Sequence, residues 1–236
     1  MSAENIIIAA IKSWNLRNAE VLKKQLDGSY QIHIIHRKED LNNTWLQKLN
    51  PSYIFFPHWS WKIPEAIYEN YECVVFHMTD LPFGRGGSPL QNLIRQKIYR
   101  TKISAIKAGQ ETDGGDIYLK RDFYVGLGSA EELYMSASDI IFFDMIPYIL
   151  SHRPIPVPQQ GTPVYFTRRK PEESDMSHQH FETLQDIYDF IRMVDAEGYP
   201  RAYIQLGQFK IIFSGIQKKS GLLTGKFEIT EDFGQS

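Results

Sequence analysis

The sequence predicts an α/β protein built on a mostly parallel, twisted β-sheet. Short apolar runs rich in β-branched and aromatic residues alternate with segments whose apolar side chains have helical spacing. Strands that alternate with helices form βαβ crossovers, and these build parallel sheets whose strands are buried on both faces. The four strands expected from this pattern are residues 6–11, 30–35, 53–56 and 73–77.

Three helices are expected between these strands. The first follows the loop at residues 13–15, with Asn15 or Asn18 as its N-cap and Asp27-Gly28 as its end. The second covers residues 44–49, and the third covers 64–69 with a proline in its first turn. Parallel sheets bind ligands at the carboxyl ends of their strands. We therefore expect the site among the loops at residues 13–15, 57–63 and after residue 77.

The residue pattern after residue 89 predicts further helices and strands. Ser129 and Glu132 form a capping box that begins a long helix, and Pro147 is expected to kink or end it. Residues 102–107 alternate polar and apolar side chains, which is typical of a strand with one solvated face. The other expected elements are helices at 90–97 and 183–194, strands at 117–120 and 162–167, a hairpin from 199–206 and 209–213, and a strand at 221–229.

Composition limits the possible partners. The 236 residues carry a formal net charge of −2, so no global field attracts nucleic acid, and we expect no nucleic-acid partner. No signal peptide or membrane span is predicted at the N-terminus, so we expect a cytoplasmic protein without membrane attachment. The single cysteine, Cys73, lies in an apolar run and is expected to be buried and inert.

Several chemical motifs can be rejected. Residues 84–87 lack the glycine spacing of a dinucleotide-binding loop, and residues 221–227 are one residue short of a phosphate-binding loop. His178 and His180 alternate as a metal site requires, but no spaced cysteine or carboxylate set completes one, so we expect no metal.

One pair of titratable residues remains. His77 ends a strand and faces a glycine-rich loop, and Asp113 lies in a later loop. An aspartate that orients a histidine and stabilises its charged form gives a general acid–base couple. The alternative is a structural histidine and a solvated aspartate. The spacing permits the pair to meet without requiring it.

The segment from His77 to Pro89 resembles a signature of folate-dependent formyltransferases. The matching positions are His77, Thr79, Leu81-Pro82, Arg85-Gly86 and Pro89. Residues 113–117 and 61–65 are similar to two further segments of that family, and residues 160–169 are similar to the segment that closes its domain. The resemblance covers roughly residues 5–170, and it is closest to the sugar N-formyltransferases, which share the core of methionyl-tRNA formyltransferases.

The resemblance implies a Rossmann-like core at residues 1–170, followed by a small helix and β-hairpin extension at 171–236. It also implies N10-formyltetrahydrofolate as co-substrate, with His77 as general acid–base and Asp113 orienting it. The residues implied for the co-substrate are Trp61, Lys62, Ile63, Gln110, Thr112 and Asp116. The residues implied for the acceptor are Met78, Thr79, Arg85, Gly86, Tyr199 and Arg201.

One position departs from the family pattern. The family has asparagine two residues before the histidine, where it donates to the formyl oxygen, and this chain has Val75. Valine cannot donate a hydrogen bond from its side chain. A backbone amide, the imidazolium or another side chain must then replace it, with Gln91, Asn92 and Thr79 as candidates.

The resemblance to sugar N-formyltransferases makes the amino group of a nucleotide-linked amino sugar the expected acceptor. A 4-amino-4,6-dideoxyhexose on uridine or thymidine diphosphate is the best candidate, as used in surface polysaccharides and flagellar glycans. The alternatives are a methionyl-tRNA formyltransferase-like enzyme with another amine acceptor, a folate- or nucleotide-binding protein with weak or no catalysis, and a formyl-folate hydrolase. Aromatic residues in the C-terminal extension suggest a homodimer.

Overall fold

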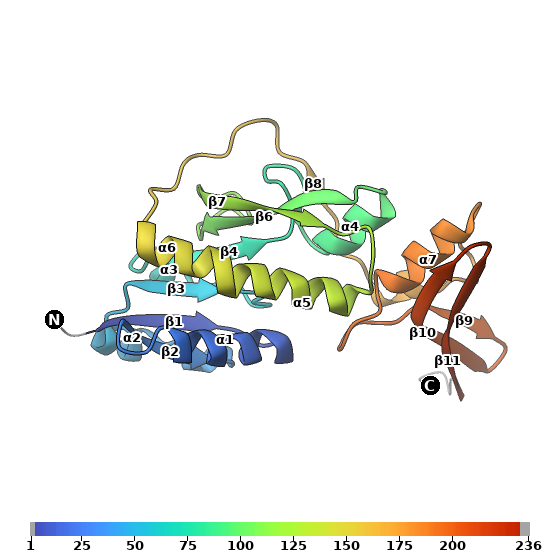
Figure 1. Ribbon diagram of the computed structural model, residues 1–236, viewed down its shortest axis with the longest axis horizontal. Helices are drawn as coiled ribbons and strands as arrows, with labels where there is room; N and C mark the ends of the chain where they lie inside the picture. The colour runs from blue at the N-terminus through green and yellow to red at the C-terminus, as the bar shows by residue number, and fades with distance from the viewer. Residues whose placement is uncertain (1–2, 232–236) are drawn as a thin grey trace. The chain divides into compact units, whose positions relative to one another are not determined.

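The computed structural model describes residues 3–231 and confirms the α/β fold (Figure 1). The chain divides into two compact units. Unit 1 comprises residues 1–86, 101–123 and 135–165, and unit 2 comprises residues 87–100, 124–134 and 166–236. Each unit is described by itself.

A six-stranded sheet forms the centre of unit 1, in the order β2-β1-β3-β4-β6-β7. The parallel pairs are β1 with β2, β1 with β3, and β3 with β4, whereas β4 and β6 are antiparallel. Strands β2, β3 and β4 have the predicted bounds. The strands are β1 (Glu4–Ala9), β2 (Tyr30–Ile35), β3 (Tyr53–Phe56), β4 (Cys73–His77), β6 (Arg100–Lys107) and β7 (Ile117–Tyr124).

Helices accompany this sheet at the predicted places. The Ser129–Glu132 capping box is present, because each side chain accepts from the backbone N–H of the other residue. Pro147 does not end the helix, since the chain passes through a π-helical segment at residues 141–145 and places the proline in the first turn of α6. The helices are α1 (Ser13–Gln25), α2 (Asn43–Leu49), α3 (Glu65–Tyr68), α5 (Ala130–Ile140) and α6 (Ile146–His152), with a short 3₁₀ turn at Lys38–Asp40.

Two local predictions are wrong. Asn15 and Asn18 lie inside α1 rather than at its N-cap; the Asn15 amide donates to the Pro57 carbonyl, and the Asn18 amide donates to Ser138 and Asp139. Strand β6 has no solvated face between Ile103 and Ile106, because all four residues are buried. In both cases tertiary contacts satisfy polar side chains that a local pattern assigns to water or to a helix end.

Strands β1, β3 and β4 form the centre of the core of unit 1. Their central residues, such as Ile7, Phe55 and Val74, are fully buried, as expected for parallel strands covered on both faces. Cys73 is buried in the same layer, as predicted, and burial raises the pKa of its thiol to about 12. The helical stretch Ala130–His152 has the length and apolar composition of a membrane span, but 56% of its most apolar window is buried in the fold.

Unit 2 contains a three-stranded antiparallel sheet in the order β11-β10-β9. The Gly207-Gln208 turn joins β9 and β10 as predicted, and helix α7 contacts β10 and β11. The elements of the unit are α4 (Pro89–Arg95), a 3₁₀ turn at Pro171–Ser174, α7 (Leu184–Arg192), β9 (Tyr203–Leu206), β10 (Phe209–Lys219) and β11 (Leu222–Glu231). The short strands β5 (Arg85–Gly86) and β8 (Tyr165–Phe166) pair with each other.

Candidate active site

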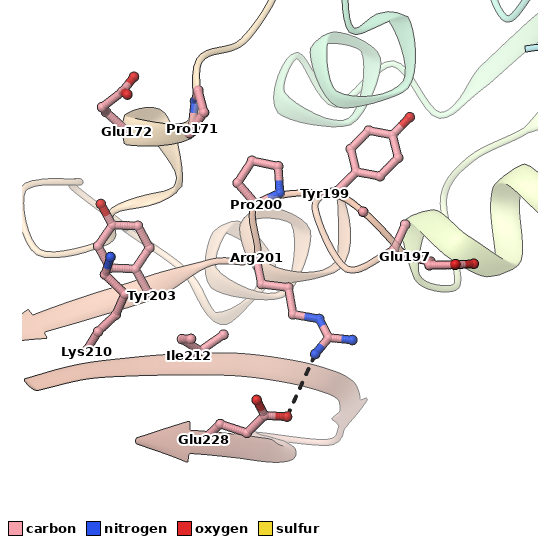
Figure 2. Close-up of a pocket in the computed structure, with 12 residues that line it drawn as sticks. Pro171, Glu172, Glu197, Tyr199, Pro200, Arg201, Tyr203, Lys210, Ile212 and Glu228 are labelled. Carbon is pink, nitrogen blue, oxygen red and sulfur yellow. Dashed lines mark ion pairs between the residues drawn. The ribbon is translucent and has the colours of Figure 1, made fainter. Parts of the chain in front are cut away.

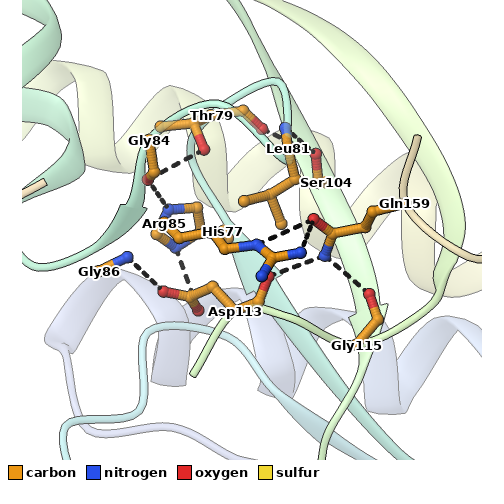
Figure 3. Close-up of polar contacts among 10 residues, drawn as sticks. All are labelled: His77, Thr79, Leu81, Gly84, Arg85, Gly86, Ser104, Asp113, Gly115 and Gln159. Carbon is orange, nitrogen blue, oxygen red and sulfur yellow. Dashed lines mark hydrogen bonds and ion pairs between the residues drawn. The ribbon is translucent and has the colours of Figure 1, made fainter. Parts of the chain in front are cut away.

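His77 and Asp113 meet in unit 1, where the ends of β4 and the β6–β7 loop come together (Figure 3). The His77 Nδ1 atom lies 3.4 Å from Asp113 Oδ1, and both side chains are largely buried. The other carboxylate oxygen, Oδ2, accepts from the Gly86 backbone N–H at 2.9 Å. Asp113 therefore touches both the histidine and the glycine loop that follows it.

The hydrogen positions on His77 follow from its partners. Its Nε2 atom lies 2.7 Å from the Gly84 carbonyl oxygen, and because a carbonyl only accepts, Nε2 carries hydrogen. A proton on Nδ1 or on Asp113 then makes the contact between the imidazole and the carboxylate attractive. The pair can thus hold and release one proton inside a buried loop, which is the requirement for general acid–base catalysis.

Arg85 fixes the loop around this pair. Its side chain is 6% exposed, and the guanidinium donates to Glu111 at 2.6 Å and twice to Gln159 Oε1 at 3.2 and 2.9 Å. The amide of Gln159 then donates to the Asp113 and Gly115 carbonyls, each at 2.8 Å. Arg85 and Gln159 together connect the glycine loop to the loop that carries Asp113 (Figure 3).

Two further contacts shape the site. The buried Ser104 hydroxyl donates to the Thr79 carbonyl at 2.7 Å, which holds the start of the His77 loop on β6. At Gly115 an added Cβ would come 1.8 Å from the Lys107 carbonyl oxygen, so only glycine fits there. Gln159 and Ser104 were missed from the sequence because neither belongs to a motif and each acts across a long sequence separation.

The residues implied for the acceptor belong to both units. Met78 and Thr79 are buried, and the Thr79 hydroxyl donates to the Gly84 carbonyl. The Arg85 guanidinium donates to Glu111 and Gln159 within unit 1, and the Gly86 backbone N–H donates to the Asp113 carboxylate.

Tyr199 and Arg201 belong to unit 2, where they line a pocket of about 700 Å³ (Figure 2). Tyr203, Lys210 and Glu228 line the same pocket. Arg201 pairs with Asp195 at 3.3 Å and with Glu228 at 3.8 Å. Burial raises the pKa of the Tyr199 phenol, so its hydroxyl stays protonated and able to donate.

The residues implied for the co-substrate lie in two loops of unit 1. Trp61 is 39% exposed and packs edge-to-face against Trp59, Lys62 is exposed, and Ile63 packs against the core. Gln110 and Thr112 are exposed beside Asp113, and the Asp116 carbonyl accepts from the Lys107 N–H. A half-exposed aromatic ring and polar side chains of this kind fit a flat heterocycle with a hydrogen-bonding edge. Among residues 3–231, no cluster of three or more potential metal ligands is present.

The candidates for replacing the family asparagine have other partners. Val75 packs against the apolar cluster that contains Ile7 and Phe56. In unit 2, Gln91 donates to the Tyr134 hydroxyl and the Met193 carbonyl, and Asn92 donates to three backbone carbonyls. Only Thr79 shares a unit with His77, and its hydroxyl donates to Gly84.

Comparison with known proteins gives a direct match over nearly the whole chain. A solved structure named methionyl-tRNA formyltransferase from Clostridium thermocellum is 54% identical, covers 97% of this chain and 99% of that chain, and superposes with a TM-score of 0.93. The chain belongs to the formyltransferase family. Residues 171–230 of the chain also match the family described as methionyl-tRNA formyltransferase, C-terminal domain.

Other relatives match the chain in part. The methionyl-tRNA formyltransferase of Rickettsia felis is 31% identical over 88 residues, which is 36% of this chain and 29% of that protein. The chain thus spans less than a third of that curated relative in the match.

Two distant structures share the fold. HypX from Aquifex aeolicus, solved in complex with tetrahydrofolic acid, is 15% identical with a TM-score of 0.72, covering 91% of this chain and 38% of that chain. A 4-N formyltransferase from Francisella tularensis is 15% identical with a TM-score of 0.69, covering 86% and 93%. The expected special likeness to sugar N-formyltransferases is therefore not supported, since these share only the fold and the sequence similarity lies with proteins named methionyl-tRNA formyltransferases.

Proposed function

We propose that this protein transfers a formyl group from N10-formyltetrahydrofolate to a primary amine, with His77 and Asp113 at the reaction centre. The observation that carries the proposal is the buried pair itself, in which Nδ1 of His77 faces Asp113 at 3.4 Å. The 54% identity to a protein named a formyltransferase supports the reaction class. The exposed Trp61 ring and the polar side chains of the 57–63 and 109–116 loops support a pterin-binding role for Trp61, Lys62, Ile63, Gln110, Thr112 and Asp116.

When bound, the folate supplies the formyl group. The transfer forms one carbon–nitrogen bond to the amine and breaks one to N10, and it moves one proton from the amine to N10. His77 relays that proton through Nε2, which exchanges its Gly84 partner for substrate. Asp113 keeps Nδ1 turned toward itself and stabilises the imidazolium. With Val75 in place of the family asparagine, we assign stabilisation of the developing negative charge to the His77 imidazolium.

The names of the relatives favour methionyl-tRNA as the amine acceptor. The C. thermocellum protein, which matches over almost its full length, carries that name. A methionyl-tRNA acceptor would be a nucleic-acid substrate, which the overall charge of the chain does not predict.

A nucleotide-linked amino sugar is the second candidate, and the charge of the C-terminal extension favours it. Residues 171–236 contain 6 Lys and Arg against 11 Asp and Glu, a formal charge of −5. A domain that binds the phosphate backbone of tRNA is expected to be basic. For either acceptor, we propose that Tyr199 and Arg201 of the unit-2 pocket contribute binding contacts, since they supply a phenol hydroxyl and a guanidinium.

The test is formyl transfer measured by mass spectrometry. The wild-type protein is incubated with N10-formyltetrahydrofolate and either methionyl-tRNA or UDP- and dTDP-4-amino-4,6-dideoxyhexoses, and a formyl adduct on one acceptor class identifies it. His77→Asn and Asp113→Asn are each expected to lower kcat by about 10²- to 10⁴-fold. Folate binding without an adduct on any acceptor would contradict the proposal and favour a binding protein, and formate release without an acceptor would indicate a hydrolase.

A further inference from the structure

The C-terminal sheet of unit 2 separates its side chains by polarity. Residues that pair directly across antiparallel strands project to the same face. The pairs Phe209–Leu206, Ile211–Ile204, Ile211–Ile229 and Phe213–Phe227 place seven apolar residues on one face, with Glu231 at its end. The opposite face carries Gln205, Lys210, Ser214, Lys226 and Glu228 together with Tyr203 and Ile212, and it contributes to the pocket of Figure 2.

The apolar face is open to solvent at its outer strand. Phe227 and Ile229 on β11 are 64% and 59% exposed, and Leu206 beside the β9–β10 turn is 62% exposed. Ile211 and Phe213, on the middle strand β10, are partly buried. An apolar sheet face that stays this exposed is typical of a surface used for association.

The outer edge of β11 also has free pairing capacity. The Phe213 N–H donates to the Ala202 carbonyl, so the backbone groups of Phe213 point toward β9. Its partner Phe227 is then in a non-hydrogen-bonded pair, and the Phe227 N–H and C=O point to the outer edge. Alternate residues do the same, so Gly225 and Ile229 are also directed outward. Within residues 3–231 no strand pairs with this edge, whereas the β9 edge is bridged by Asp175.

The charges on β11 select one partner and one register. In an antiparallel pairing of β11 with a second copy centred on Phe227, Lys226 of each copy faces Glu228 of the other. Centring the pairing on Lys226 or on Glu228 opposes like charges, and centring it on Gly225 or Ile229 pairs Lys226 or Glu228 with threonine. Opposite charges stabilise cross-strand pairs and like charges destabilise them. The strand is therefore complementary to itself in one register, in which two Phe227 side chains also meet on the apolar face.

We propose that this protein forms a homodimer in which the β11 strands of two copies pair antiparallel around Phe227. The two three-stranded sheets become one six-stranded sheet with a continuous apolar face. This pairing gives the outer edge of β11 its hydrogen-bond partners and removes an open strand edge from solvent. The proposal does not depend on the acceptor or on the reaction.

A cysteine scan tests the register. In the paired strands the two Phe227 Cα atoms lie about 5.5 Å apart, a separation that a disulfide spans. Phe227→Cys is expected to form a covalent dimer under mild oxidation at low protein concentration, with Cys73 buried and unreactive. Thr230→Cys is the matched control, because residue 230 faces residue 224 of the other copy. Equal cross-linking of both variants, or of neither, would overturn the proposed register.

A charge-exchange cycle tests the same contact without altering Phe227. Lys226→Glu and Glu228→Lys are each expected to weaken dimerisation by about tenfold, since each opposes like charges twice. The double variant restores opposite charges and is expected to dimerise within about threefold of the wild type. Sedimentation equilibrium of the full chain gives these constants. A wild-type protein that stays monomeric at all concentrations, or a double variant as weak as the singles, would overturn the proposal.

Discussion

Among residues 3–231, each unit contains one buried arginine, and the two arginines have different partners. Arg192 in unit 2 is fully buried and pairs with the buried Asp189 at 2.6 Å, while its other nitrogens donate to the Gly128 and Val125 carbonyls. Arg85 in unit 1 is 5% exposed and pairs with Glu111, whose side chain is 58% exposed.

This difference separates a stabilising arginine from a positioning one. All partners of Arg192 hold elements of unit 2 together, and Tyr99 and Tyr188 lie against its guanidinium. The partners of Arg85, in contrast, connect it to the loop that carries Asp113, because Glu111 lies in that loop and Gln159 donates to the Asp113 carbonyl. We therefore expect loss of Arg192 to reduce stability, and loss of Arg85 to reduce activity more than stability.

Replacing Arg192 is expected to have the largest effect on stability. Arg192→Met leaves the Asp189 carboxylate and two backbone carbonyls without their guanidinium donor, and breaking such a buried pair costs about 3–5 kcal/mol. The four tryptophans (14, 45, 59 and 61) all lie in unit 1, so hydrogen exchange by mass spectrometry is the appropriate probe for unit 2. The exposed Lys219→Met serves as the control, and equal protection in both variants would contradict the stabilising role.

Arg85→Lys is expected to impair catalysis while the fold remains. Lysine keeps the charge but lacks the planar fork that reaches Glu111 and Gln159 together. We expect kcat for formyl transfer to fall by about 10- to 100-fold, as for residues that orient catalytic groups. Urea unfolding followed by tryptophan fluorescence, which reports on unit 1, should show a loss well below the about 3–5 kcal/mol expected for Arg192→Met in unit 2. A lysine variant with normal kcat would remove Arg85 from the positioning network.

Gln159→Ala tests whether the partner of Arg85 also positions the loop that carries Asp113. The variant removes the amide that joins Arg85 to the Asp113 and Gly115 carbonyls, and we expect kcat to fall by about tenfold or more. Its pH–rate profile should also change, because the position of Asp113 relative to His77 changes. The neighbouring exposed Gln160→Ala is the matched control and should leave both unchanged. Equal profiles for the two variants would show that the Asp113 loop is held by other contacts.

His58 is expected to cause a smaller, pH-dependent effect. It lies in the loop after β3 against Trp14, and burial lowers the pKa of its imidazole to about 4. Between pH 6.5, the ordinary histidine pKa, and pH 4, the unfolded chain binds the extra proton, so stability falls as pH falls through this window. The loss is at most about 3 kcal/mol. His58→Gln should reduce the change with pH of the free energy of unfolding, measured by urea denaturation between pH 6.5 and pH 4. The control His36→Gln, at an exposed position, should leave that change as in the wild type.

The fold was predictable because its strands are continuous apolar runs and its helix ends carry local signals. Strand β4 has the expected bounds, and the Ser129 capping box makes the expected hydrogen bond. The His77–Asp113 pair could be named from its residues, but Gln159 and Ser104 could not, since their roles arise from contacts across 44 to 74 and 23 to 25 residues. The buried Arg192 was missed because a charged residue on an amphipathic helix predicts a solvated face, and its carbonyl partners Gly128 and Val125 lie 64 and 67 residues away.

The central claim is that His77 and Asp113 form a formyl-transfer centre. The most direct measurement is single-turnover formyl transfer by the wild type, Asp113→Asn and His77→Asn, with folate binding measured in parallel. We predict that both variants bind the folate with near-normal affinity and transfer the formyl group at least about 100-fold more slowly. Transfer by either variant at the wild-type rate would contradict the account.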